Sequence, residues 1–323
     1  MNLVKLPEKK FENWNAFVDS SAQGSIFCKT WYLNILNADY DIYCLYDNNK
    51  IKAGFAYTRD VLGFRSNPLF VKYLGVLLEP IDGSLISRRF KEESLTEQIL
   101  SLLSKNKQFN YTFHPNYPNW LPFYWKGYRQ QTRYTYILNL SKGWEQIWAS
   151  VKNTVRTDYR KAEKNGIEIR EISPDDFYSI YKKTFQRQGG NPPLGFARFL
   201  NICNKLIKIN AVKLIASVNS DNEFLAAAGI LIEKKATYLI WCGYDHTKCV
   251  GGEQTYAILN AIRSVIGISE IFDFEGSMIK GIAKYYSSFG GDLTTYHKIW
   301  RPSLVNFTKE FTVGTYKKLN YRR

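Results

Sequence analysis

Two acidic residues in the second half of the chain are spaced so that they could act together on an amine. Asp273 and Glu275 alternate in a segment that reads FDFEG. If this segment is a strand, both carboxylates point to one face, because successive side chains of a strand alternate. A carboxylate beside a glycine could orient an amine or accept its proton. The alternative is structural, with the carboxylates capping the next helix and pairing with Lys280 or Lys284.

A cationic stretch precedes this segment. Arg156, Arg160, Lys161 and Lys164 fall within a pattern typical of a helix, and two acidic residues interrupt the run. Arg156 and Arg160 are four residues apart and would share one face of that helix. The stretch could contact an anionic substrate or tRNA, or it could simply be a solvated helix face.

Two adjacent glycines indicate a possible anion site. Gly251 and Gly252 precede a segment that should be helical, and backbone N–H groups at a helix start bind anions. This turn is therefore a candidate site for phosphate groups. Lys298, on the segment expected to form the last strand, is a further candidate phosphate ligand.

Hydrophobic periodicity predicts a mixed α/β chain that positions these residues. The first half should contain helices, a strand pair with a DNNK turn, and then a strand, a helix and a strand. The second half should run helix, strand, two helices, three antiparallel strands, helix, strand, helix and strand. The expected elements of the second half are 143–166, 167–173, 174–190, 196–210, 211–245, 254–267, 270–276, 279–290 and 293–301.

Length and composition indicate a folded protein of two domains. The chain has 323 residues, and its 45% hydrophobic and 16% aromatic content exclude a disordered chain. We place the division near Asn139, giving lobes at 1–139 and 140–300 and a tail at 301–323 that returns to the first lobe. Five scattered cysteines and three histidines give neither a disulfide framework nor a metal site.

The net charge of +15 indicates a partner with negative charge. The first residues lack the apolar core of a signal peptide, and no apolar run is long enough to span a bilayer. We expect a cytoplasmic protein, with peripheral contact at the inner membrane face left open.

Three motifs resemble the FemAB-like proteins, transferases built from two GNAT lobes. They are RTDYRKAEKNGI at 156–167, FDFEGSM at 272–278 with YYSSFGG at 285–291, and SIF at 25–27 with Trp31. The resemblance spans most of the chain, and the second lobe carries nearly all of its specificity. It implies an α/β (α+β) fold of two tandem GNAT-like lobes, with mixed sheets flanked by helices and a degenerate first lobe.

The resemblance implies an acyl- or aminoacyltransferase. Such enzymes form an amide on an amine of a nucleotide-linked or lipid-linked cell-wall or surface-polysaccharide precursor. The acyl donor is a co-substrate, aminoacyl-tRNA or acyl-CoA, and no bound cofactor or metal is implied. Two alternatives remain open: an acyl-CoA-dependent N-acyltransferase of an amino sugar, and a non-catalytic basic protein that binds RNA or a membrane.

The resemblance also implies roles for two further residues. It places a precursor phosphate near Arg187, whose planar guanidinium suits phosphate, although a cation at a helix end is also favoured by the helix dipole. Tyr244 follows a strand where a GNAT lobe opens its cleft, and could protonate a leaving group or bind an oxyanion; the alternative is ordinary packing. The resemblance further implies that the turn with Gly251 and Gly252 binds phosphate groups of the donor. The GNAT phosphate turn reads Arg/Gln-x-x-Gly-x-Gly/Ala, whereas this chain has KCVGGEQ at 248–254.

Overall fold

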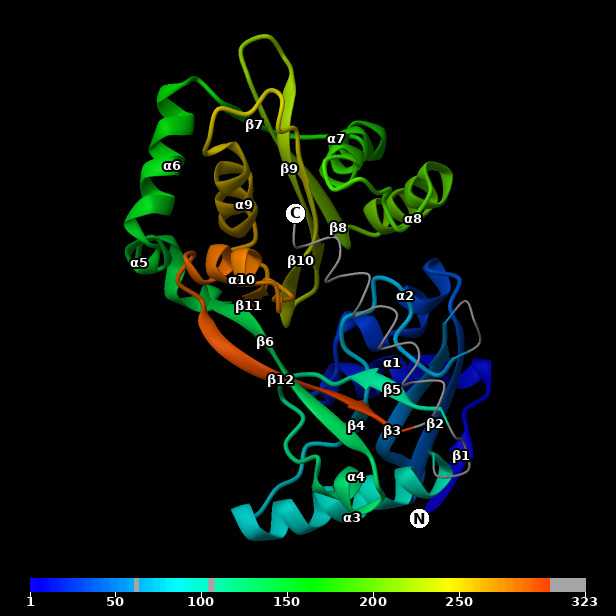
Figure 1. Cartoon of the computed structure of the whole chain (residues 1–323). Helices are drawn as coiled ribbons and strands as arrows, with labels where there is room; N and C mark the ends of the chain where they lie inside the picture. Colours follow the sequence, from blue (N-terminus) through cyan, green and yellow to red (C-terminus); the bar gives the residue numbers. More distant parts are fainter. Residues whose placement is uncertain (61–63, 104–107, 303–323) are drawn as a thin grey trace. The chain divides into compact units, whose positions relative to one another are not determined.

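The computed structural model describes residues 1–60, 64–103 and 108–302, which form two compact units (Figure 1). The first unit comprises the described residues of Met1–Arg133 and Thr295–Arg323, and the second is Tyr134–Thr294. Two long strands, β6 (Arg129–Asn139) and β12 (Asp292–Trp300), each belong partly to both units. The expected tail at 301–323 lies, apart from its first two residues, outside the described residues.

The first unit contains a four-stranded antiparallel sheet in the order β1-β2-β3-β4, and β5 pairs antiparallel with β12. The DNNK turn between β2 and β3 forms as expected, with Asn48 and Asn49 at φ values of 45° and 62°. Asparagine tolerates this left-handed conformation, which two-residue hairpins require. The elements are β1 (Asn2–Lys5), the 3-10 turn η1 (Glu8–Lys10), α1 (Phe11–Ser20), the 3-10 turn η2 (Ile26–Cys28), α2 (Thr30–Ile35), β2 (Asp39–Asp47), β3 (Lys50–Arg59), β4 (Val76–Leu78), α3 (Leu85–Leu103), β5 (Asn110–Thr112) and α4 (Leu121–Trp125).

Many of the aromatic residues lie in the core of the first unit. The rings of Phe109 and Tyr111 lie 4.8 Å apart, and Phe55 meets Tyr111 edge-on at 5.1 Å. The Tyr111 hydroxyl is buried and donates a hydrogen bond to the Thr58 carbonyl oxygen. A buried tyrosine hydroxyl needs a hydrogen-bond partner, and Tyr111 has one within the core. We therefore assign these aromatic residues to packing of the core.

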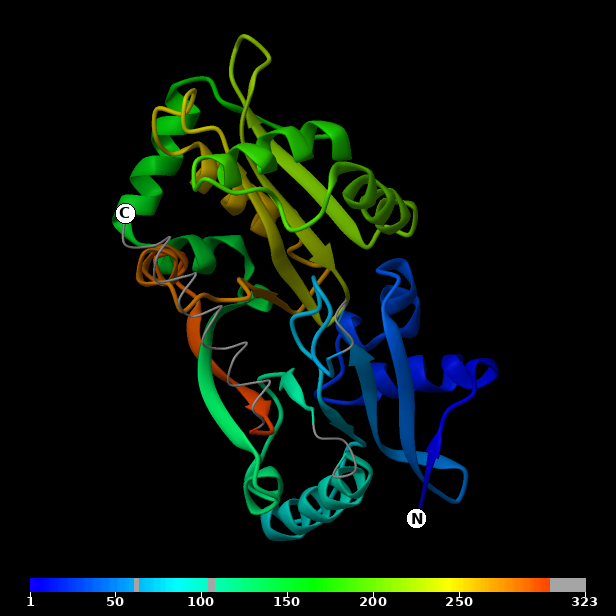
Figure 2. The ribbon, with the colours of Figure 1, turned by 45° about the vertical axis from the view of Figure 1, so that its right-hand side comes forward.

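The second unit is a mixed sheet with strands in the order β6-β11-β10-β9-β8-β7. Helices α7 and α8 cover one face, and α9 covers the other together with α5 and α6 (Figures 1 and 2). Its elements are the 3-10 turn η3 (Leu140–Lys142), α5 (Gly143–Ser150), α6 (Asn153–Lys164), β7 (Glu168–Glu171), α7 (Pro174–Gln186), α8 (Phe196–Lys208), β8 (Val212–Val218), β9 (Phe224–Ile232), β10 (Ala236–Tyr244), α9 (Glu253–Arg263), β11 (Ile271–Asp273) and α10 (Lys280–Ser287).

The single helix expected at 143–166 is wrong, because the chain forms two helices there. Val151 has an extended backbone, with ψ at 135°, and ends α5. The N–H of Lys152 then donates to the Ser288 carbonyl oxygen at 2.9 Å instead of continuing the helix. The cationic residues therefore belong to α6 alone.

A bulge in β10 decides which residues reach each face of the sheet. The register with β9 shifts between Leu239 and Trp241. Leu239 joins the core beneath α9, whereas Trp241 packs on the other face, 4.9 Å from the Phe199 ring of α8. One extra residue in a strand reverses the side-chain alternation beyond it. Cys242 consequently lies on the α9 side of the sheet.

Among the described residues, no helix combines the length and apolar character needed to cross a bilayer.

Candidate functional site

Strands β10 and β11 part in the middle of the second unit's sheet. They pair in parallel from Ala236 with Ile271 to Tyr238 with Asp273. β11 ends there, whereas β10 continues to Tyr244. We call this divergence the fork; it gives the second half of β10 an edge that β11 does not cover.

Tyrosines of α10 surround the fork, together with residues of β10. Cys242 and Tyr244 are two residues apart on β10 and therefore face one side. Burial first, and then the neighbouring Cys242 and Tyr285, raise the pKa of Tyr286 well above its usual value, and the charge of Glu275 raises it further. Glu275 thus lies within electrostatic range of the fork.

Asp273 anchors the loop that follows β11. Its side chain is buried, and Oδ1 accepts hydrogen bonds from the Thr135 hydroxyl at 2.5 Å and from the Glu275 N–H at 2.7 Å. The expected strand through residue 276 is wrong, because β11 stops at Asp273. Strand alternation therefore does not place the two carboxylates on one face, and Asp273 shapes the loop that presents Glu275.

Glu275 has a strained backbone. Its φ of 55° is left-handed, and five of the seven described non-glycine residues with positive φ are asparagines. A glutamate there costs roughly 1 kcal/mol or more. Such strain persists where the surrounding structure imposes it, which is common at functional sites.

A hollow of about 320 Å³ opens where α7 and β10 end. Asp245 is fully buried at its wall; its carboxylate accepts from Lys183 Nζ at 2.5 Å and from the Thr247 hydroxyl at 2.7 Å. Burial alone would raise the pKa of Asp245, but these hydrogen bonds outweigh it and lower the pKa to about 2. We call this space the α7 hollow, lined by Lys183, Gln186, Arg187, Asp245, His246 and Thr247.

Two sequence-predicted residues meet beside the α7 hollow. The Arg187 guanidinium lies 5.9 Å from the centre of the Tyr244 ring, and the Tyr244 N–H donates to the Thr184 hydroxyl at 2.9 Å. Burial raises the pKa of the Tyr244 hydroxyl, and Cys249 and Glu253 raise it further, although Arg187 opposes them. The hydroxyl therefore stays protonated at neutral pH and can donate a hydrogen bond.

The glycine turn is occupied by the chain's own carboxylate. Glu253 is 1% exposed, and its two carboxylate oxygens accept from the N–H groups of Val250 and Gly251, each at 2.9 Å. Two of the N–H groups expected to cradle a donor phosphate are thus already satisfied. Glu253 directly follows the glycine pair in the sequence, and its acidity at a helix start was the signal that sequence reasoning missed.

Gly252 and Lys161 fix this turn against α6. A Cβ on Gly252 would lie 2.5 Å from the Asp158 carbonyl oxygen, so only glycine allows the close approach. Lys161 Nζ donates to the Val250 carbonyl oxygen at 2.8 Å. Lys161, a predicted substrate ligand, therefore contacts the turn itself.

The other predicted cations lie elsewhere. On α6, Arg156 hydrogen-bonds the Asn153 side chain, and Arg160 lies 5.9 Å from the Trp148 ring centre. Lys298 belongs to the first unit, where its Nζ lies 5.8 Å from the Trp300 ring centre.

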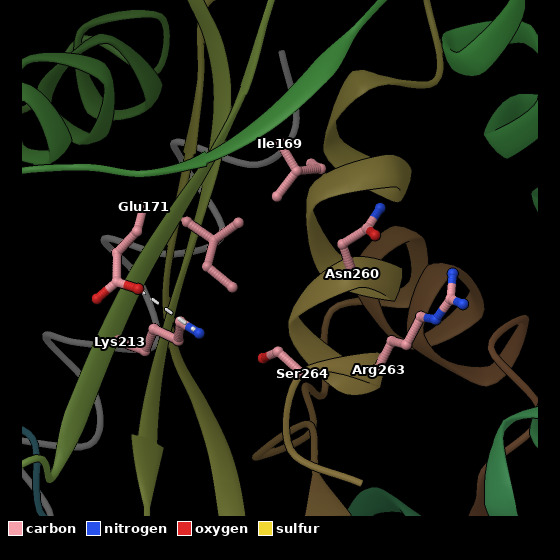
Figure 3. A pocket seen from close by; sticks show the side chains of 7 residues that line it. Ile169, Glu171, Lys213, Asn260, Arg263 and Ser264 are labelled. Atoms are coloured by element: carbon pink, nitrogen blue, oxygen red, sulfur yellow. Dashed lines mark ion pairs between the residues drawn. The ribbon is translucent and has the colours of Figure 1, made fainter.

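A second hollow, of about 460 Å³, lies between α9 and strands β7 and β8 (Figure 3). Glu171 and Lys213 form an ion pair of 3.5 Å along its sheet wall, and Asn260 and Arg263 come from α9. Its lining residues differ from those singled out by the sequence, and two of its three charged side chains pair with each other. The fork and the α7 hollow are therefore the stronger candidate site.

The thiols near the fork are not poised as nucleophiles. Burial raises the pKa of Cys242 to about 12, and burial with the charge of Glu253 raises that of Cys249 to about 12. A thiol attacks as its thiolate, which is scarce at neutral pH under these conditions. Within residues 1–60, 64–103 and 108–302, no group of His, Cys, Asp and Glu is arranged to hold a metal ion.

Comparison with solved structures shows that the helix-flanked sheets of the two units form a tandem GNAT fold. The chain is similar to FemX (TM-score 0.68, 11% identity, 92% of this chain and 97% of that one). It is also similar to L-PGS from Bacillus licheniformis, with a TM-score of 0.54 and 11% identity over 98% of this chain and 97% of that one. A third similar structure is a tandem GNAT protein from the clavulanic acid biosynthesis pathway, with a TM-score of 0.56 and 9% identity over 94% of this chain and 99% of that one. These similarities confirm the expected fold of two tandem GNAT-like lobes. No protein-family model and no curated protein matches the sequence.

Proposed function

We propose that this protein is an acyltransferase that joins an activated acyl group to an amine at the fork of its second unit. The proposal is supported by two observations: the strained carboxylate Glu275 lies within electrostatic range of Tyr286 at the fork, and the protonated phenol of Tyr244 lies beside the exposed guanidinium of Arg187. Amide formation needs a proton acceptor for the amine and a donor for the leaving oxygen.

In the proposed reaction, the amine nitrogen attacks the carbonyl carbon of the donor ester and a C–N bond forms. Glu275 accepts the proton that the nitrogen loses. The C–O bond then breaks, Tyr244 donates its proton to the leaving oxygen, and the tyrosine regains a proton from solvent. Arg187 would bind a phosphate of the acceptor, and Asp273 would position Glu275 through the loop.

The occupied glycine turn favours an aminoacyl ester, as in charged tRNA, over acyl-CoA as donor. The Glu253 carboxylate satisfies the N–H groups of Val250 and Gly251 and would repel a diphosphate at the same place. This single observation carries the choice of donor. For the acceptor, the resemblance of the three sequence motifs to FemAB-like proteins favours an amine on a cell-wall precursor.

The test offers the purified protein radiolabelled aminoacyl-tRNA or acetyl-CoA with amine-bearing nucleotide-linked or lipid-linked cell-wall precursors. We expect label transfer from aminoacyl-tRNA, and its loss in Glu275→Gln and Tyr244→Phe. Transfer from acetyl-CoA alone, to an amino sugar, would assign a CoA-dependent N-acyltransferase instead. Transfer from neither donor would favour a non-catalytic basic protein.

Titration calorimetry with CoA tests the role of Glu253 separately. We expect no CoA binding by the wild type and measurable binding by Glu253→Ala, whose freed N–H groups can accept phosphate. Equal CoA binding by both proteins would contradict the donor choice.

A further inference from the structure

Large apolar side chains are exposed on two helices of the first unit, far along the chain from the fork. On α3, residues 85–91 are all exposed, and burial begins only at Leu95. On α4, the exposed residues are three and four positions apart and therefore share one side. The six side chains are 42% to 68% exposed: Leu85, Ile86, Phe90, Leu121, Tyr124 and Trp125.

The two helices form one surface. Helices α3 and α4 contact each other, as Figure 1 shows within the first unit. Leu85 and Leu121 line the same hollow of about 420 Å³, together with Arg88, Arg89 and Glu92, whose single carboxylate faces two guanidinium groups. We call these six apolar side chains and their neighbouring cations the α3–α4 surface. Large exposed apolar patches usually mark a binding surface.

We propose that the α3–α4 surface binds the face of an anionic lipid bilayer. Its apolar residues are interspersed with Arg88, Arg89 and Lys126, all exposed. Arginine and lysine extend toward lipid phosphates while apolar neighbours enter the acyl boundary, and Trp and Tyr rings favour the headgroup level.

Charge favours a bilayer over a protein partner. The chain carries a net charge of +15, which an anionic leaflet attracts over many residues at once. The centres of protein interfaces are depleted in charged residues, whereas here Arg89 falls between Leu85 and Ile86 around the helix. This inference does not depend on the proposed transfer reaction.

The experiment measures co-sedimentation of the full chain with vesicles of phosphatidylcholine alone or with phosphatidylglycerol. We expect binding only to the anionic vesicles. The apolar variant Phe90→Ser/Trp125→Ser should bind about tenfold more weakly, because two large side chains no longer enter the bilayer. Its matched control, Ile209→Ser/Ile268→Ser, removes two exposed apolar residues from the second unit and should bind like the wild type.

Two double charge-reversal variants distinguish attraction by the α3–α4 surface from attraction by the overall charge of the chain. Arg88→Glu/Arg89→Glu should lose binding, and Lys205→Glu/Lys208→Glu, with the same change in net charge on exposed positions of α8, should retain most of it. Equal losses in both pairs, or no binding by the wild type, would overturn the proposal. A dimer of the wild type that Phe90→Ser/Trp125→Ser converts to a monomer in light scattering would assign the surface to a second copy instead.

Discussion

The Glu253 carboxylate accepts a 2.9 Å hydrogen bond from the backbone N–H of Gly251, two residues earlier in the chain. This contact closes the turn before α9 from within. The same carboxylate also takes the N–H of Val250, so one buried side chain satisfies two backbone donors at a helix start. The turn has the glycines of a phosphate site, but the Glu253 carboxylate occupies the place of the phosphate.

Removing this carboxylate should destabilise the second unit. In Glu253→Ala, two backbone N–H groups lose their partner, which costs about 2–3 kcal/mol of unfolding free energy. Urea denaturation measures the change. Glu163→Ala, at an exposed position of α6, should stay within about 0.5 kcal/mol of the wild type. Similar values for the two variants would contradict this role of Glu253.

Gly276 should tolerate no side chain. A Cβ there would lie 2.0 Å from the Tyr134 carbonyl oxygen and 2.6 Å from the Thr135 Cα, and the residue has a φ of 60°. Because the obstacle is backbone, Gly276→Ala should lower the melting temperature by about 10 °C or more. Gly281→Ala, in α10, meets nothing within 4 Å and should be neutral or slightly stabilising. An unchanged melting temperature in Gly276→Ala would show that the loop can move.

Substitutions of Glu275 should lower turnover strongly while changing stability little. Glu275→Gly relieves a left-handed glutamate and should change the free energy of unfolding by no more than about 1 kcal/mol, while abolishing acyl transfer. Glu275→Gln keeps the side chain's shape and should lose about 100-fold in kcat with an unchanged melting temperature. Full turnover in Glu275→Gln would remove this residue from the proton transfer.

The Asp245–Lys183 ion pair should make stability depend on acid pH. The folded pKa of Asp245 is about 2, below its ordinary 3.8, so its stabilisation is complete above about pH 4 and is lost as the pH falls toward 2. The shift corresponds to about 2 kcal/mol. The gap in unfolding free energy between wild type and Asp245→Asn should therefore be wide at pH 6 and nearly closed at pH 2. Asp82→Asn, at an exposed position, should show no such convergence.

Arg187 should govern acceptor binding more than chemistry. Because a guanidinium–phosphate contact contributes about 1.5–3 kcal/mol, Arg187→Ala should raise KM for a phosphate-bearing acceptor about 10- to 100-fold with little change in kcat. Steady-state kinetics with varied acceptor measures this. Lys182→Ala, an exposed neighbour on α7, serves as the control. A fall in kcat alone would place Arg187 in the reaction step.

The sequence alone determined the alternation of strands and helices and the DNNK hairpin, because these follow from local periodicity and turn chemistry. The twin-lobe resemblance came from three sequence motifs. It also drew attention to Glu275, Tyr244 and Arg187. The sequence did not show that the two carboxylates have different settings. β11 ends at Asp273, and the side chain of this residue accepts a hydrogen bond from Thr135, which is distant in the chain.

Only the tertiary structure decided which residues share a face and which anion fills the turn. The bulge between Leu239 and Trp241 depends on how β10 pairs with β9, and it places Cys242 toward α9. The glycine turn looked like an open phosphate cradle, but the approach of α6 at Asp158 and the fold of Glu253 onto its own turn closed it. The bulge and the approach of α6 depend on packing between distant segments, which no local pattern of residues records. The Glu253 contact is local, and the acidity of this residue at the helix start was its signal in the sequence.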